Sequence, residues 1–160
     1  MTRTEVDALL EEAGKRGFMW HQYRVDRHGP DVLAGVYQWE GFADVVVIAD
    51  TTHAHAYRTP TGPNTDVFAP THVTWWYGDN TRLWQSRPDR LPVTGIGAGS
   101  LVWTLRALLT LPAPGDPHAP ATLVPALPGT GISGARVPVR IRRRTVTRPQ
   151  QDTRQFGATS

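Results

Sequence analysis

His53 and His55 are the residues whose types and spacing most suggest chemistry. Positions i and i+2 of a β-strand point to the same side, so the two imidazoles of a His-x-His pair can share a metal ion. His21 or His72 would then supply a third ligand. A typical site of this kind is completed by a glutamate shortly after the pair, whereas this chain has Arg58, whose charge disfavours a cation. We therefore predict no metal and no other cofactor, and we interpret both histidines as solvent-facing strand residues.

Other catalytic signatures are weak or missing. The run from Gly95 to Ser100 precedes a predicted helix, where free N–H groups can bind an anion. It lacks the lysine of a phosphate-binding loop and the βαβ setting of a dinucleotide loop. The chain has no cysteine and no Gly-x-Ser-x-Gly motif. Four aspartates occur at predicted turns or strand ends, where this residue already has a structural role, namely Asp44, Asp50, Asp66 and Asp79.

Aromatic side chains give the stronger functional signal. Trp75 and Trp76 are adjacent, so on a strand they must point to opposite faces of the sheet. If helices cover only one face, several large aromatic side chains remain on the other, where they favour binding of a protein partner or a second copy of the chain. A second helix placement that buries both faces is the alternative. The predicted partner-binding residues are Trp20, Trp39, Trp75, Trp76, Tyr77 and Trp84.

A second candidate surface is the basic end of the chain. Residues 136–154 contain seven arginines and one acid, which leaves ten basic and thirteen acidic residues elsewhere. A flexible segment of this kind binds phosphates without recognising a base sequence. A charged tail that only keeps the protein soluble is the alternative. The predicted polyanion-binding residues are Arg136, Arg140, Arg142, Arg143, Arg144 and Arg148.

These residues must be positioned by a small number of elements. Val6, Leu9, Leu10 and Ala13 have helical spacing and predict an amphipathic helix over 3–16, with Gly17 just beyond its end. A second apolar stripe predicts a helix over 101–111 that ends at Pro112. Alternating patterns and turn residues predict six strands, at 18–27, 32–40, 43–50, 54–59, 71–77 and 81–86.

The order of these elements predicts the fold class. We expect an α+β domain over 1–111, an antiparallel β-meander of about six strands with an N-terminal and a C-terminal helix packed on one face. The four β-branched residues 45–48 place the hairpin 42–59 at the centre of this sheet. Pro and Gly dominate 112–135, which predicts a linker, and residues 136–160 are predicted to be an Arg-rich flexible tail.

Composition narrows the function class. The charged N-terminal segment lacks an apolar signal-peptide core, and no apolar run is long enough to span a bilayer, so we expect a cytoplasmic protein that does not contact membranes. The leading hypothesis is a non-enzymatic adaptor that binds a protein partner or itself through its aromatic sheet face. A nucleic-acid-associated protein that acts through its tail is the first alternative. The second is a small metal- or ligand-dependent enzyme that uses His53 and His55.

Overall fold

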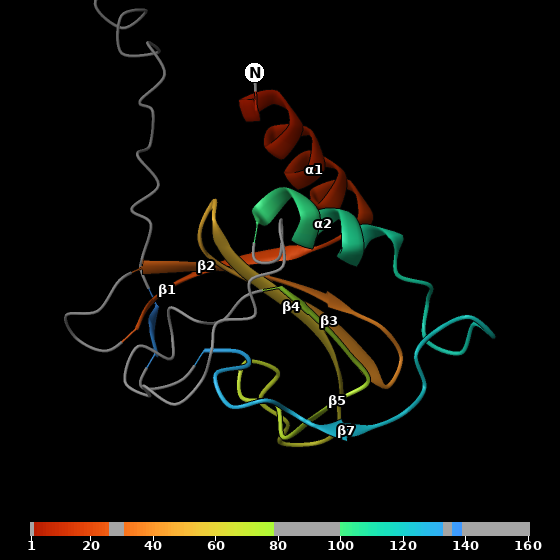
Figure 1. Cartoon of the computed structure of the whole chain (residues 1–160). Coiled ribbons are helices and arrows are strands. Elements are labelled where there is room, and N and C mark those ends of the chain that lie inside the picture. The colour runs from red at the N-terminus through yellow and green to blue at the C-terminus, as the bar shows by residue number, and fades with distance from the viewer. Residues whose placement is uncertain (1, 26–30, 79–99, 133–135, 139–160) are drawn as a thin grey trace, which may run out of the picture.

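A six-stranded antiparallel sheet organises the molecule (Figure 1), in the order β6-β4-β3-β2-β1-β8. The computed structural model describes residues 2–25, 31–78, 100–132 and 136–138. Strands β1, β2, β3, β4 and β6 form a meander, and β8 pairs with the outer edge of β1. The strands are β1 (Met19–Val25), β2 (Asp31–Gln38), β3 (Phe42–Asp50), β4 (His53–Pro60), β6 (Trp75–Gly78) and β8 (Arg136–Pro138), and a separate two-stranded sheet pairs β5 (His72–Val73) with β7 (Val124–Pro125).

The β3–β4 hairpin is the centre of the sheet, as the sequence predicts. Val45, Val46 and Val47 are buried, and side chains on both faces of these strands contribute to cores. The turn is closed by Asp50, whose carboxylate accepts hydrogen bonds from the Thr52 N–H at 2.8 Å and from the Thr52 hydroxyl at 2.7 Å. An aspartate that binds the backbone two residues later fixes a turn of this kind.

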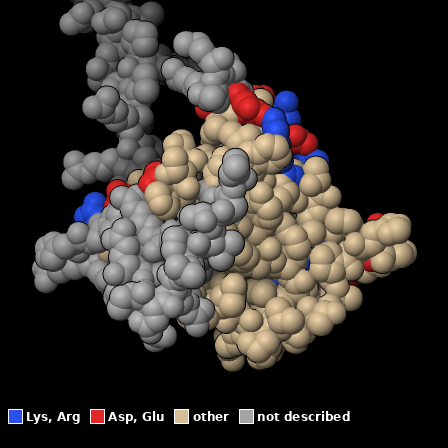
Figure 2. All heavy atoms as spheres, viewed as in Figure 1, with Lys and Arg blue, Asp and Glu red and all other residues tan. Residues whose placement is uncertain are grey.

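Two helices, α1 (Thr2–Arg16) and α2 (Leu101–Thr110), lie on one side of the sheet (Figure 1). Leu101, Leu105, Leu108 and Leu109 of α2 are buried in a first core cluster with Val46 and Ala56 of the sheet. Lys15 and Arg16, at the C-terminal end of α1, form ion pairs with Glu11 and Glu12 one turn back along the helix. Figure 2 shows charged side chains gathered at the upper right of the molecule, on the side of the helices. None of the helices in the described ranges combines the length and apolar character that crossing a bilayer requires.

The opposite face of the sheet is covered by irregular segments instead of helices. Phe68, Val73 and Ile132 pack over Val45 and Tyr57 in a second core cluster. The Tyr57 hydroxyl donates to the Val67 carbonyl at 2.6 Å, and burial raises the pKa of this phenol. The last described residues of the predicted linker 112–135 therefore pack on the sheet through Ile132. A single isoleucine among prolines and glycines forms no helical or strand pattern, so the sequence did not indicate this contact.

Two further elements differ from the sequence-based prediction. The predicted strand 71–77 is interrupted at Thr74, so that β5 pairs with β7 while β6 pairs with β4. The first three residues of the predicted tail form β8, in which Arg136 is paired with Val25. The predicted strand 81–86 lies outside the described residues.

Candidate binding site

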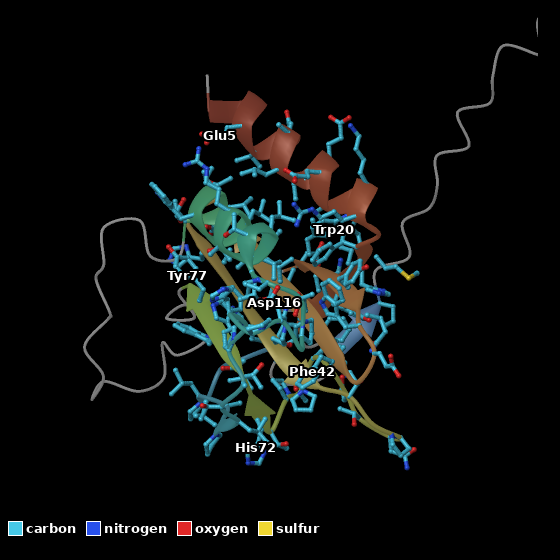
Figure 3. All side chains as sticks on the ribbon, turned by 90° about the vertical axis from the view of Figure 1, so that its right-hand side faces the viewer. Glu5, Trp20, Phe42, His72, Tyr77 and Asp116 are labelled. Atoms are coloured by element: carbon cyan, nitrogen blue, oxygen red, sulfur yellow. The ribbon has the colours of Figure 1, made fainter. Side chains whose placement is uncertain are left out.

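The predicted aromatic residues do not share one face of the sheet. Trp20 and Trp75 pack against the first core cluster, beneath the helices, whereas Trp76 packs against the second. Tyr77 stacks on Trp75, with ring centroids 6.3 Å apart. Figure 3 shows Trp20 and Tyr77 toward opposite sides of the sheet, because Tyr77 lies on the edge strand β6 and Trp20 on β1, next to the other edge strand, β8. Trp84 lies outside the described residues, and a partner-binding role for the set stays a prediction.

Trp39 belongs to a different arrangement, built around a buried ion pair. Its indole N–H donates to Asp44 Oδ2 at 2.9 Å. Arg58 donates to the same carboxylate twice, from Nε to Oδ1 at 2.6 Å and from Nη2 to Oδ2 at 2.9 Å. Asp44 is 4% exposed and Arg58 1% exposed. The two residues are directly opposed across the β3–β4 ladder, so the hairpin register holds this bidentate pair in place.

An aromatic row extends outward from this ion pair. The rings of Phe18 and Tyr37 have centroids 5.5 Å apart, and those of Tyr37 and Trp39 are 4.6 Å apart. The row and the C-terminal ends of both helices enclose a cavity of about 260 Å³, which we call the helix-end cavity. Its lining residues are Arg16, Phe18, Tyr37, Trp39, Asp44, Leu108 and Leu111.

Two arginines hold the wall of this cavity. Arg16 of α1 donates to the Leu109 carbonyl of α2, and Arg58 Nη1 donates to the Pro112 carbonyl at 2.7 Å. Carbonyl groups at a helix C-terminus carry partial negative charge, which these guanidinium groups neutralise. The Arg58 guanidinium also lies over the Trp39 ring, 5.8 Å from its centroid. The helix-end cavity is thus a preformed space between elements that are fixed to one another.

A second, wider hollow of about 470 Å³ lies on the other face of the sheet. It shares Arg16 and Tyr37 with the helix-end cavity, but Met19 is paired with Val36, which packs against the second core cluster, whereas Tyr37 packs against the first. The two spaces are therefore separate. Met19 lines the wider hollow and is 67% exposed.

The His-x-His pair is divided between two environments. The Nδ1 of His53 lies 2.9 Å from Asp50 Oδ1 at the hairpin turn. Partial burial alone would raise the pKa of Asp50, but the hydrogen bonds from Thr52 and His53 lower it below its usual range. His55 is 2% exposed, contrary to the predicted solvent-facing position, and its Nε2 accepts a hydrogen bond from the Gly131 N–H at 2.9 Å.

The histidines considered as third ligands lie elsewhere. His21 stacks on Tyr23, with centroids 6.0 Å apart, and His72 is exposed beside the Thr71 hydroxyl. Within the described ranges, no three histidine or carboxylate side chains are grouped in a way that could hold a metal ion.

Arg136 is the one predicted polyanion-binding residue within the described ranges. It makes a two-point contact with the Asp66 carboxylate, with Nη1 to Oδ1 at 3.0 Å and Nη2 to Oδ2. Its guanidinium lies 5.1 Å from the Phe68 ring centroid and 5.8 Å from that of Tyr23. The hydrogen bonds from Arg136 lower the pKa of Asp66 and raise that of Arg136 itself. Arg136 therefore attaches β8 to the segment beside it, and a role for the arginine tail in polyanion binding stays a prediction.

Sequence reasoning missed most of the helix-end cavity. Of its lining residues, only Trp39 belonged to the predicted binding set, and Asp44 was considered only as a strand-end aspartate. A regular hairpin that turns at 51–52 would pair Asp44 with Thr59. The irregularity between Ile48 and Asp50 shifts the register by one residue and brings Asp44 opposite Arg58. The turn position alone therefore did not indicate this ion pair.

Comparisons of the chain with protein-family models, with curated proteins and with solved structures found no match.

Proposed function

We propose that this chain is a non-catalytic adaptor that binds a protein partner by accepting one of the partner's side chains in the helix-end cavity. The observation that carries this proposal is the aromatic row of Phe18, Tyr37 and Trp39, which lines a preformed space on a fixed polar base. Binding sites of proteins combine apolar walls with a few convergent polar groups in this way.

The size of the space favours a side chain over a cofactor. Pockets that bury drug-sized ligands enclose roughly 300–1,000 Å³, and the helix-end cavity is smaller, at about 260 Å³. A single aromatic or large aliphatic side chain is the chemical group of matching size. Aromatic side chains that enter such pockets are also the residues that contribute most binding energy in protein interfaces.

The wider hollow on the other face of the sheet is not an extension of this site. Met19 and Val36 line it and belong to the face that carries the second core cluster. The proposed interface is therefore the helix-end cavity and its rim, in place of an open sheet face.

The experiment uses blocked amino-acid amides as models of a partner side chain. N-acetyl amides of leucine, phenylalanine, tyrosine and tryptophan are titrated into ¹⁵N-labelled protein, and the Trp39 indole N–H resonance is followed by NMR. We expect saturable shifts, with Kd values of roughly 1 mM for the leucine, phenylalanine and tryptophan amides, because so small a ligand gives limited binding energy.

A blocking variant and a matched control locate the binding. Leu111→Trp fills the cavity from its wall and should weaken binding at least about tenfold, which corresponds to 1.4 kcal/mol. Leu127→Trp makes the same change at a side chain that is 49% exposed in another segment, and it should bind as the unmodified chain does. The proposal fails if no amide shifts Trp39, or if Leu111→Trp binds as well as the control.

A further inference from the structure

We infer that the side chain accepted by the helix-end cavity is an unmodified tyrosine, whose hydroxyl donates to Asp44. This inference rests on the proposed function and specifies its ligand. It is carried by the position and the hydrogen bonds of the Asp44 carboxylate, the buried acceptor among the residues that line the cavity.

The carboxylate retains capacity to accept one more hydrogen bond. A carboxylate has about four acceptor positions, two on each oxygen. Among the described residues, Oδ2 accepts from Arg58 Nη2 and Trp39 Nε1, whereas Oδ1 accepts from Arg58 Nε. A hydroxyl is well suited to the remaining position, since O–H donors form short, strong bonds to carboxylates.

The charges around the cavity select a neutral donor. Arg58 already neutralises Asp44 through two hydrogen bonds, so an incoming lysine or arginine meets no uncompensated negative charge there. Arg16 on the cavity wall is likewise paired, with Glu12. A phosphorylated tyrosine presents mainly acceptor oxygens at neutral pH, so it has no hydroxyl to donate to Asp44 and brings a charge that finds no free cation among the described residues there. Phosphorylation of the tyrosine should therefore weaken its binding.

The depth of Asp44 distinguishes tyrosine from tryptophan. Asp44 is 4% exposed, whereas Tyr37 and Trp39 on the walls are partly exposed, so the acceptor lies at the inner end of the cavity. A phenol carries its donor at the tip of the ring, in line with the direction of entry. An indole carries its donor on the side of the ring, where it would face the aromatic walls. Only the phenol places its ring between the aromatic walls and its donor beside Asp44.

The test varies the ligand, because Asp44→Asn would leave the buried Arg58 without its carboxylate and risks unfolding the chain. Three probes are compared with N-acetyl-tyrosinamide by the Trp39 NMR titration. They are the phenylalanine amide, the O-methyltyrosine amide and the phosphotyrosine amide. We expect the tyrosine amide to bind roughly ten- to hundredfold more tightly than each of these three probes. This ratio corresponds to the free energy of one hydrogen bond to a charged group.

The outcomes separate the inference from the proposed function. Equal affinity for the tyrosine and phenylalanine amides overturns the tyrosine inference and leaves the adaptor proposal standing. Tighter binding of the phosphotyrosine amide also overturns it, and would assign Arg16 as the selecting residue. If none of the amides shifts Trp39, the inference and the proposed function fail together.

Discussion

At the scale of single residues, the Asp44–Arg58 pair sets the character of the site. Burying two charges costs several kcal/mol, which only good geometry and additional hydrogen bonds offset. Here the Trp39 N–H and the Pro112 carbonyl provide those bonds. The same contacts fix the Trp39 ring and the end of α2, so the ion pair also positions two walls of the helix-end cavity.

Arg58→Met should lower the free energy of unfolding by about 3–5 kcal/mol, because it leaves the Asp44 carboxylate buried without its cation. Chemical denaturation in urea, followed by circular dichroism, measures this loss. The double variant Asp44→Leu/Arg58→Met should lose less than the single variant, since it removes both charges.

Arg24→Met is the matched control for this prediction. Arg24 also pairs with an aspartate, Asp31, but the two side chains are 47% and 41% exposed. Exposed pairs contribute about 0–1 kcal/mol. Equal losses for Arg24→Met and Arg58→Met would contradict a special role for the buried pair.

At the scale of elements, the C-terminal end of α1 shows how local sequence builds the cavity. The Phe18 N–H donates to the Ala13 carbonyl and the Gly17 N–H to the Gly14 carbonyl, both at 3.1 Å. This pattern is a Schellman motif, and it requires a left-handed residue just after the helix. Gly17 meets that requirement with φ of 108°. The motif turns the chain so that Phe18 joins the aromatic row.

Gly17→Ala should therefore destabilise the protein by about 1 kcal/mol, the approximate cost of a side chain in left-handed backbone. A Cβ at this position has ordinary contact with the Tyr37 ring at 3.5 Å, so backbone strain is the main cause. Thermal and urea unfolding both report this change.

Gly14→Ala gives the opposite sign in the same helix. Gly14 lies inside α1, and nothing lies within 4 Å of a Cβ added there. Alanine should stabilise the helix by about 0.5–1 kcal/mol. If both substitutions have the same sign, the conformation at Gly17 does not decide the end of α1.

Most elements of the sheet and both helices could be predicted because their signals are local. The β-branched run of β3 and the apolar stripe of α2 each determine the structure of their own segment. Gly17 likewise determines the end of the helix just before it. The helix-end cavity could not be predicted in the same way. It joins Phe18, Asp44 and Leu111, which come from three separate parts of the chain, and only the packing of α2 on the sheet brings them together.

At the scale of the whole molecule, the sheet is buried between two unlike layers. Helices cover one face, and the segments around Phe68 and Ile132 cover the other. The second layer is attached to the sheet by hydrogen bonds that include those from Gly131 N–H to His55 and from the Tyr57 hydroxyl to the Val67 carbonyl. The bond from Ile132 N–H to the Phe68 carbonyl, at 2.8 Å, joins the two segments of this layer to each other. With both faces covered, the helix-end cavity becomes the more favourable place for a partner.

The attachment of this second layer depends on Gly131. Its φ is 85°, and a Cβ there would collide with the Phe68 carbonyl. Gly115 is a matched control, because its φ is 89° but nothing lies within 4 Å of its added Cβ. Gly115→Ala should thus report backbone strain alone, at about 1 kcal/mol.

Gly131→Ala should cost about 2.5–6 kcal/mol more than Gly115→Ala in urea unfolding. The collision displaces the segment, which breaks a buried hydrogen bond, at about 1–3 kcal/mol, and exposes Ile132, at about 1.5–3 kcal/mol. Binding of the hydrophobic dye ANS should rise in Gly131→Ala only, because the second core cluster opens. If the two variants lose equal free energy of unfolding and neither binds the dye, residues 126–132 are a linker that lies on the surface, as composition predicts. The segment around Phe68 alone would then cover the second face of the sheet.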